Sequence, residues 1–302
     1  MGYKEVKNKL RRTATHLSRR VSGKPRIIAA LTSYPPRIGT VDKAIRSLLA
    51  QRTLPDKIVL YLFEGDFPSK EKELPPQLKD LLANDVIVRW VDQDLKPHKK
   101  WYWAFKDHPD DLVVLFDDDL VYRNDLIKEL ILCHNHFPDC VCAARTHFVV
   151  VDEDGLLLPY DKWEFEAPSR YTELIFKPSD QLFMTTGAGT LFPPSPLSEK
   201  AFNIDMIRDL CLNADDVWLN EMLRLDGVKV VAATGRQELV YVPGTQEVAL
   251  YHENLASGGN DGYFRKLSDA LNGGKMEEFS SKYIDRDLGS INQQLLEKRR
   301  RV

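Results

Sequence analysis

The sequence predicts an α/β protein with a Rossmann-like, mostly parallel central sheet that is flanked by helices. Between about residues 25 and 120, short apolar runs alternate with segments of helical periodicity, which is typical of strand–helix–strand units. After residue 120 this alternation gives way to turn-rich and aromatic-rich sequence, so we expect an irregular second half. At 302 residues the chain is long enough to bury a full core in one large domain.

Four apolar runs in the first part predict the parallel strands of the sheet. They cover Arg26–Ser33, Lys57–Phe63, Val86–Val91 and Leu112–Phe116. Continuous runs rich in Val, Ile and Leu are typical of strands that are buried on both faces. Between them we expect helices over Val41–Gln51, Pro76–Ala83 and 99–106. The first helix should turn Ala44, Ile45, Leu48 and Leu49 inward and take Thr40 or Asp42 as its N-cap.

The second half is predicted element by element. We expect a helix over Asn124–His136 with Asn124 as its cap, and further helices that begin near Ser198 and Asp215. Val228–Ala233 has the composition of a strand, and the glycines and polar groups of Val248–Asn260 indicate a loop.

Composition and charge narrow the class of protein. The chain is 43% hydrophobic and 29% charged, as globular proteins are, and its net charge of -3 gives no reason to expect nucleic acid as the partner. No apolar run approaches the ~18 residues that span a membrane, and the beginning lacks the apolar core of a signal peptide. Four cysteines do not form a disulfide framework in a chain of this length. We therefore expect a cytoplasmic protein.

The two ends are more basic than the middle. Up to Lys24, eight Lys and Arg residues face a single Glu5, and Val6, Leu10, Leu17 and Val21 share one helical face. Such a basic helix with an apolar stripe suits an anionic membrane surface, which would place the protein at the inner face of the membrane. The alternative is a solvated basic arm. The cations of Lys298–Arg301 could add to the same contact.

The acidic triplet Asp117–Asp119 directly follows the fourth predicted strand. The carboxyl ends of parallel strands face the crevice in which open α/β sheets bind ligands. Three adjacent carboxylates repel one another, so a divalent cation, Mg²⁺ or Mn²⁺, is the expected partner. Asp119 would bind the metal, and Asp117 a ribose or a metal-bound water. The alternative is that these residues only end the strand and cap the next helix.

Two loops near the carboxyl ends of strands could bind a nucleotide. Lys96, His98, Lys99 and Lys100 could hold phosphates, or form a solvated charged loop. In Thr32–Arg37, Tyr34 could stack on a base and Arg37 could pair with a phosphate, although Pro35 and Pro36 could simply shape a turn.

Later in the chain, an acidic pair is a candidate general base and a histidine is a candidate metal ligand. Asp216, or Asp215, could be a general base at the start of a helix, whereas the alternative is that Asn213 caps this helix and Asp216 completes a capping box. His252 could complete a metal site or be an ordinary surface residue.

Taken together, Thr32–Tyr34, the acidic triplet and Ala214–Asp216 resemble the GT-A type nucleotide-sugar glycosyltransferases, most of all the bacterial family-2-like enzymes of polysaccharide and glycoconjugate biosynthesis. The resemblance covers roughly residues 25–265. It implies a GT-A fold with a basic extension over 1–24, a catalytic domain over 25–272 and a helical tail over 273–302. Within that domain, 25–120 would be the nucleotide-binding half and 121–272 the acceptor half.

The resemblance also implies roles for single residues. Asp117 and Asp119 would match the family's Asp-x-Asp motif, which binds the donor ribose and the metal–diphosphate, with Asp118 between them. Thr32, Ser33 and Tyr34 would line the base pocket, and Lys99 or Lys100 would help to hold the diphosphate. Asp216 or Asp215 would be the base, and His252 a late metal ligand. The turn Thr186–Gly189 would lie near the donor sugar or the acceptor.

The function implied is that of a metal-dependent hexosyltransferase. It would move a sugar with inversion from a nucleotide-diphosphate sugar, with a UDP-sugar as the favoured donor, to a glycan or a lipid-linked acceptor. One alternative is a phosphatase of the haloacid dehalogenase type that uses Asp117 and Asp119, since Asp117–Val121 fits its nucleophile motif. Another is a non-catalytic relative that binds carbohydrate or nucleotide. A nucleotidyltransferase is disfavoured, because no glycine-rich phosphate loop follows the first strand.

Overall fold

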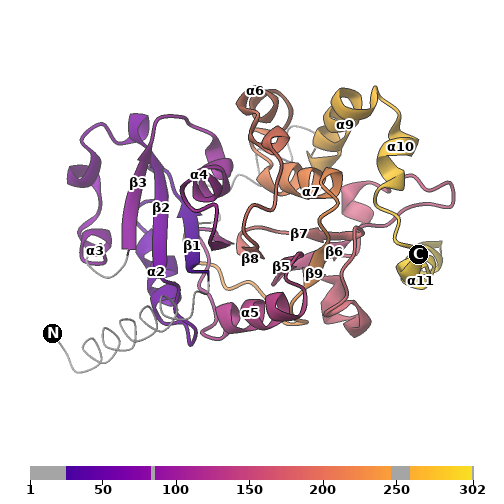
Figure 1. Ribbon diagram of the computed structural model, residues 1–302, viewed down its shortest axis with the longest axis horizontal. Helices are drawn as coiled ribbons and strands as arrows, with labels where there is room; N and C mark the ends of the chain where they lie inside the picture. The colour runs from indigo at the N-terminus through magenta and orange to yellow at the C-terminus, as the bar shows by residue number, and fades with distance from the viewer. Residues whose placement is uncertain (1–24, 83–85, 246–258, 301–302) are drawn as a thin grey trace. The chain divides into compact units, whose positions relative to one another are not determined.

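The computed structural model describes residues 25–82, 86–245 and 259–300, and its course is drawn in Figure 1. The chain forms two compact units, each built from separate stretches. The first contains Met1–Ile131, Gly187–Ser195 and Leu239–Val248. The second contains Leu132–Thr186, Pro196–Glu238 and Ala249–Val302. The predicted basic extension 1–24 and His252 lie outside the described residues.

A mostly parallel sheet forms the centre of the first unit. Its strands are β1 (Ile27–Thr32), β2 (Lys57–Phe63), β3 (Val86–Val91), β4 (Leu112–Phe116) and β8 (Ala188–Phe192). Their order is β3-β2-β1-β4-β8, and only β8 runs antiparallel, to β4. All residues of β4 are buried, whereas exposed and half-buried residues alternate between the buried ends of β3, which lies at the edge of the order. The predicted α/β fold class with a mostly parallel sheet is confirmed.

Helices connect the parallel strands, as the sequence predicts. They are α2 (Val41–Leu49), α3 (Pro76–Lys79) and α4 (Lys99–Asp107), and α5 (Leu126–His136) begins in this unit. Short 3-10 turns cover Glu64–Asp66, Lys70–Glu73 and Lys96–His98. In α2, Ala44, Ile45 and Leu48 are buried, and Leu49 is half-buried. The α4 helix packs on β1, β2 and β4, and its Phe105 ring lies 5.0 Å from that of Phe192 in β8.

The second unit is irregular, as expected. Its strands form two short pairs, β5 (Val141–Ala143) parallel to β9 (Val230–Ala232), and β6 (Thr146–Phe148) antiparallel to β7 (Leu182–Met184). Its helices are α6 (Ile204–Met206), a π-helical turn (Ile207–Cys211), α7 (Asp215–Leu225), α9 (Gly259–Asn272), α10 (Met276–Ser281) and α11 (Gly289–Arg300). Its 3-10 turns cover Tyr160–Lys162, Ala167–Ser169, Thr172–Leu174, Glu199–Phe202 and Arg286–Leu288.

Aromatic rings from distant segments form the core of the second unit. The ring of Trp163 lies 5.3 Å from those of both Phe183 and Phe264, and Phe264 lies 6.3 Å from Tyr283. All four side chains are buried. The aromatic-rich stretch that has no clear periodicity in the sequence therefore supplies much of the core.

The α2 and α7 helices begin where predicted, at Val41 and Asp215, but the predicted roles of Thr40 and Asn124 differ from the structure. The Thr40 hydroxyl donates to the Arg37 carbonyl and makes no cap to α2. The α5 helix begins at Leu126, and the backbone carbonyl of the predicted cap, Asn124, accepts from the Arg52 N–H. The bond from the Thr40 hydroxyl to nearby backbone competes with capping.

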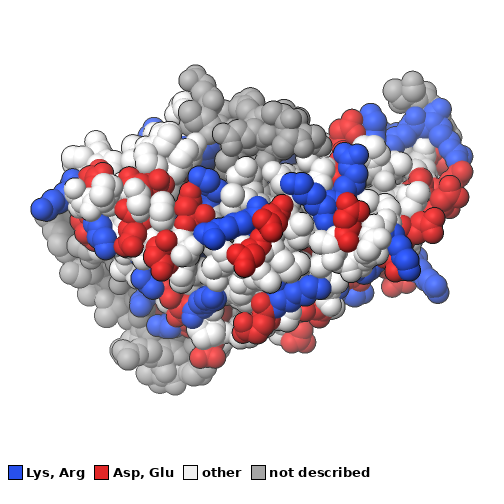
Figure 2. All heavy atoms as spheres, turned by 90° about the horizontal axis from the view of Figure 1, so that it is seen from above, with Lys and Arg blue, Asp and Glu red and all other residues white. Residues whose placement is uncertain are grey.

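The C-terminal cations contact acidic groups of their own unit. Arg299 lies 3.5 Å and Lys298 4.0 Å from the Glu164 carboxylate, and Arg300 pairs with Glu153. Figure 2 shows Lys and Arg side chains intermixed with Asp and Glu over the visible face. These pairs offset the positive charge that was expected to add to a membrane contact. Among the described residues, no helix is both long and apolar enough to cross a membrane.

Candidate functional site

An irregularity between β4 and β8 sets the position of the acidic triplet. Leu115 pairs with Thr190, but Phe116 pairs with Ala188, so Gly189 is the extra residue of a β-bulge. Gly189 has φ +102, and a Cβ there would lie 2.8 Å from the Leu126 side chain. Position 189 requires glycine for both reasons. The acidic triplet begins directly after Phe116, the β4 residue that is paired beside this bulge.

Asp117 is fitted closely against Gly187. The Asp117 N–H donates to the Gly187 carbonyl over 3.2 Å and to the Tyr122 hydroxyl over 2.7 Å. The Tyr122 hydroxyl in turn donates to the Gly187 carbonyl over 2.6 Å. A Cβ on Gly187 would lie only 1.6 Å from Oδ2 of Asp117. The carboxylate therefore occupies the space that any side chain at position 187 would need.

Asp118 holds the loop after β1 against the triplet. Its Oδ2 accepts from the Ser33 hydroxyl over 2.6 Å, and its Oδ1 accepts from Nη1 of Arg37 over 2.9 Å. Burial raises the pKa of Asp118, and the Arg37 guanidinium opposes that rise. Both carboxylate oxygens are thus engaged within the protein, so Asp118 joins the two predicted ligand-binding segments.

Arg37 also pairs with the third member of the triplet. Its Nη2 lies 3.2 Å from Oδ2 of Asp119 and donates to the Thr245 carbonyl over 3.4 Å. Burial alone would lower the pKa of Arg37, but Asp118 and Asp119 raise it above its ordinary value. The guanidinium therefore remains charged. Its Nε is buried and has no hydrogen-bond partner among the described residues.

The predicted basic cluster divides between two acidic partners. Nζ of Lys100 lies 2.5 Å from Oδ1 of Asp117, and those of Lys96 and Lys99 each lie 2.7 Å from Asp94. Partial burial would raise the pKa of Asp94, but these two lysines lower it to about 2. His98 is buried, and its Nδ1 accepts from Nε1–H of Trp101 over 3.1 Å. Lys100 thus joins this cluster to the triplet.

These ion pairs correct the sequence argument for a metal. Mutual repulsion of the three carboxylates does not by itself demand a cation from solution, because Arg37 and Lys100 offset two of the charges. Within the described parts of the chain, no group of three or more His, Cys, Asp or Glu side chains is arranged to hold a metal.

The residues fit a metal that is shared with a ligand. Mg²⁺ is commonly held by one or two carboxylates together with substrate phosphates, and needs no cage made by the protein alone. The Asp117 side chain is 41% exposed, and only its Oδ1 contacts Lys100, so its carboxylate can face such an ion. Asp119 can supply a second oxygen.

The remaining residues of the β1 loop have local roles. The Thr32 hydroxyl donates to the Tyr61 carbonyl over 2.8 Å, which ties the end of β1 to β2. The Arg37 guanidinium carbon lies 5.9 Å from the centre of the Tyr34 ring. Arg37 thus lies between an aromatic ring and two carboxylates.

Asp215 and Asp216 open α7 in the second unit, and both face Thr186. Oδ1 of Asp216 accepts from the Thr186 N–H over 2.8 Å and from its hydroxyl over 2.6 Å. The same hydroxyl lies 3.1 Å from Oδ2 of Asp215. Ala214 occupies the N-cap position of α7 and makes no side-chain cap. Sequence reasoning missed Thr186 as the partner of these carboxylates, although it singled out the turn that contains it.

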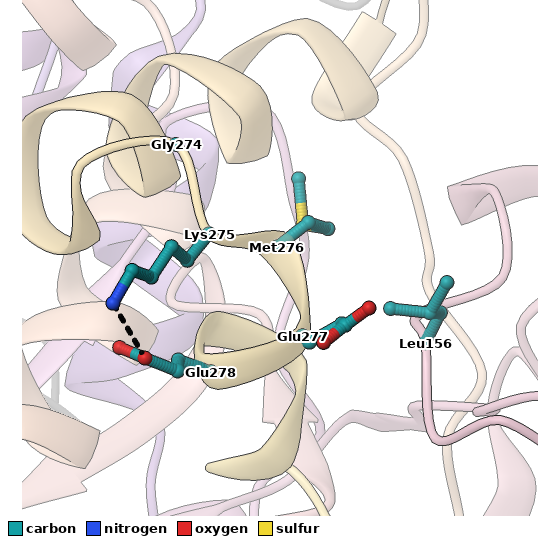
Figure 3. A pocket seen from close by; sticks show the side chains of 6 residues that line it. All are labelled: Leu156, Gly274, Lys275, Met276, Glu277 and Glu278. Carbon is teal, nitrogen blue, oxygen red and sulfur yellow. Dashed lines mark hydrogen bonds and ion pairs between the residues drawn. The ribbon is translucent and has the colours of Figure 1, made fainter.

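A pocket elsewhere in the second unit contains none of the predicted site residues. It measures about 390 Å³ and lies between Leu156 and the turn that leads into α10. Figure 3 shows Lys275 of its lining paired with Glu278, and the two charges lie 3.0 Å apart.

Comparisons with known proteins assign no family to the chain. No protein-family model matches the sequence, and no curated protein matches it. Among solved structures, 4-diphosphocytidyl-2C-methyl-D-erythritol synthase from Anaerococcus prevotii DSM 20548 has a TM-score of 0.42 and 13% identity, and the match covers 76% of this chain and 99% of that one. A second structure of a 4-diphosphocytidyl-2C-methyl-D-erythritol synthase has a TM-score of 0.43 and 10% identity, over 75% and 98%. Likenesses of this size say nothing about what the chain binds or transfers.

Proposed function

We propose that the chain is a metal-dependent GT-A glycosyltransferase that transfers a sugar from a nucleotide-diphosphate sugar to a hydroxyl of a glycan or lipid-linked acceptor, with inversion. The observation that carries the proposal is the single cluster formed by the β1 loop, the acidic triplet and Lys100. It combines an aromatic ring, the buried Lys100, the half-buried Arg37 and an exposed carboxylate at the carboxyl ends of β1 and β4. These are the groups that a base, a diphosphate and a metal require.

In this proposal each side chain of the first unit binds one part of the donor. Tyr34 stacks on the base, and Arg37 and Lys100 pair with the diphosphate. Asp117 and Asp119 hold Mg²⁺ or Mn²⁺, which would offset the negative charge that develops on the leaving nucleoside diphosphate. Ser33 and Asp118 keep the loop in place through their 2.6 Å hydrogen bond.

Asp216 is the proposed base that takes the proton from the acceptor hydroxyl. Two hydrogen bonds from Thr186 to its Oδ1 fix the direction of the carboxylate. Asp215 is buried and shares the same hydroxyl, which makes Asp216 the better candidate of the two. Deprotonation on the face opposite the leaving group gives inversion in one displacement.

A thermal-shift screen tests the donor side. The purified protein is heated with UDP, GDP, CDP, ADP and dTDP and with their sugars, each with and without Mn²⁺. Stabilisation by one nucleotide only in the presence of metal supports the proposal and names the donor class, with UDP as the first candidate. Asp119→Ala should abolish this metal-dependent shift. A flat response to every nucleotide, together with hydrolysis of simple phosphate esters, would favour the phosphatase.

A transfer assay tests the base. Asp216→Ala should keep the nucleotide-induced shift and lose sugar transfer, whereas Asp215→Asn should retain transfer. Full transfer activity in both Asp119→Ala and Asp216→Ala would show that the site is assigned wrongly. Nucleotide-sugar binding by the unmodified protein without transfer to any acceptor would identify a non-catalytic relative.

A further inference from the structure

We propose that Lys100 is an internal counter-ion of Asp117, which keeps a divalent cation from binding alone and turns to the diphosphate when donor and metal bind together. This inference rests on the proposed function and makes it more specific. It predicts that metal and nucleotide enter as a pair, and it names the residue that enforces this.

The exposure of the two partners is unequal. The Lys100 side chain is 2% exposed, whereas that of Asp117 is 41% exposed, and the two charges meet at 2.5 Å. Lys100 lies in the first turn of α4, which packs on β1, β2 and β4, so the ammonium reaches the carboxylate from inside the unit. A ligand from solution can reach Asp117, and it then meets the positive charge of Lys100 beside it.

The local charge favours joint binding. Three carboxylates and the two cations Arg37 and Lys100 leave one net negative charge in the cluster. A doubly charged ion at Asp117 would be repelled by the adjacent ammonium and guanidinium. A diphosphate brings negative oxygens that can bind the ion, Lys100 and Arg37 together, and so removes the repulsion.

The neighbouring lysine provides a matched control. Lys99 precedes Lys100 in the same helix turn, its side chain is 3% exposed, and it is ion-paired over 2.7 Å. Its partner is Asp94, which is outside the triplet. Removal of its charge should therefore reproduce the cost of losing a buried lysine and leave the Lys100–Asp117 pair in place.

The test compares Lys100→Met with Lys99→Met, because methionine keeps the length of the stem without the charge. Binding of Mn²⁺ alone is measured by electron paramagnetic resonance, and binding of UDP, GDP, CDP, ADP and dTDP with Mn²⁺ by thermal shift. Lys100→Met should bind Mn²⁺ alone at least ~10-fold more tightly than the unmodified protein. It should also bind the nucleotide–Mn²⁺ pair at least ~10-fold more weakly. Lys99→Met should match the unmodified protein in both.

The failure of this inference differs from failure of the proposed function. An unchanged or weaker affinity of Lys100→Met for Mn²⁺ alone overturns the counter-ion role, even if nucleotides bind normally. No binding of any nucleotide to the unmodified protein contradicts the proposed function, while the Mn²⁺ comparison still decides the role of Lys100. If Lys100→Met does not fold, the inference is tested by measuring Mn²⁺ binding to the unmodified protein with and without nucleotide. Its affinity for Mn²⁺ should rise more than ~10-fold with saturating nucleotide, and a smaller rise contradicts the inference.

Discussion

Position 187 has no room for a side chain, because Gly187 lies directly against the Asp117 carboxylate. Because a Cβ at 187 would lie 1.6 Å from Oδ2 of Asp117, even alanine must displace the carboxylate. The displaced carboxylate would lose its 2.5 Å contact with Lys100. The size of the residue at 187 therefore controls the geometry of the proposed metal site.

We predict that Gly187→Ala lowers both stability and ligand binding. Forced overpacking of this kind costs about 1–3 kcal/mol of unfolding free energy. The apparent affinity for nucleotide in the presence of metal should fall at least ~10-fold, since this binding depends on Asp117. Urea unfolding and the thermal-shift titration measure the two effects. Gly39→Ala is the control, because a Cβ on Gly39 meets nothing within 4 Å. Equal behaviour of the two variants would contradict the prediction.

Thr186 is the residue that contacts the proposed base, Asp216. Replacement by valine keeps the shape and the backbone N–H but removes the hydroxyl that lies 2.6 Å from Asp216. We predict that Thr186→Val reduces the rate constant of sugar transfer by ~10-fold or more and leaves the affinity for donor unchanged. Thr186→Ser restores the hydroxyl and should recover most of the rate. Steady-state kinetics distinguish the two, and an unaffected rate in Thr186→Val would remove Thr186 from the mechanism.

At the scale of elements, the start of α4 depends on one carboxylate. Asp94 accepts from the Lys96 N–H over 3.1 Å and pairs with the side chains of Lys96 and Lys99. Lys96 has φ +51, a left-handed conformation that is uncommon outside glycine. Asp94 thus fixes the turn that leads into the helix carrying Lys100.

This arrangement predicts a pH dependence of stability. The pKa of Asp94 is lowered from 3.8 to about 2 in the folded state, so its stabilising contribution is complete above the unfolded pKa and is lost as pH falls towards 2. Asp94→Asn should be less stable than the unmodified protein at pH 7, and the difference should shrink between pH 4 and pH 2. Urea unfolding midpoints measured across this range provide the test. A difference that is constant with pH would mean that the carboxylate charge is not responsible.

The elements that the sequence predicts well are those with a strong local signal. The runs Lys57–Phe63, Val86–Val91 and Leu112–Phe116 coincide with β2, β3 and β4. A short, mostly apolar run between charged turns is typical of a buried strand. The strands of the second unit have only three residues each, which is too short for a periodic pattern. Of these, β9 lies within the predicted run Val228–Ala233, whereas the position of β7 depends on packing of Phe183 against Trp163, which no local pattern reveals.

The sequence predicts where the segments of the candidate site lie on the sheet, but not which side chains pair with one another. The triplet and the β1 loop both follow parallel strands, and for that reason the sequence places them at one edge of the sheet. The pairing of Arg37 with Asp118 joins residues 81 positions apart, and only the structure shows it. Tyr122, which is buried and bonds to both Asp117 and Gly187, gives no signal of its role in the sequence.

At the scale of the whole molecule, positive charge that could meet an anionic surface is concentrated in residues 1–24. Eight Lys and Arg residues there face one Glu, whereas the chain as a whole carries a net charge of -3. The C-terminal cations Lys298 and Arg299 lie beside Glu164, and Arg300 pairs with Glu153. The two basic ends are therefore not equivalent.

We predict that residues 1–24 alone mediate any association with anionic membranes. A variant that lacks them should lose sedimentation with phosphatidylserine vesicles and keep the nucleotide-induced thermal shift. A variant with Lys298 and Arg299 changed to Gln should sediment as the unmodified protein does, because Glu164 already offsets part of that charge. Binding by the full chain should weaken steeply as salt rises from 50 mM to 300 mM, since each basic residue near such a surface contributes about 1 kcal/mol by a screened attraction. If the shortened chain still sediments, the contact lies elsewhere, and if the full chain does not sediment, the basic segment is a solvated arm.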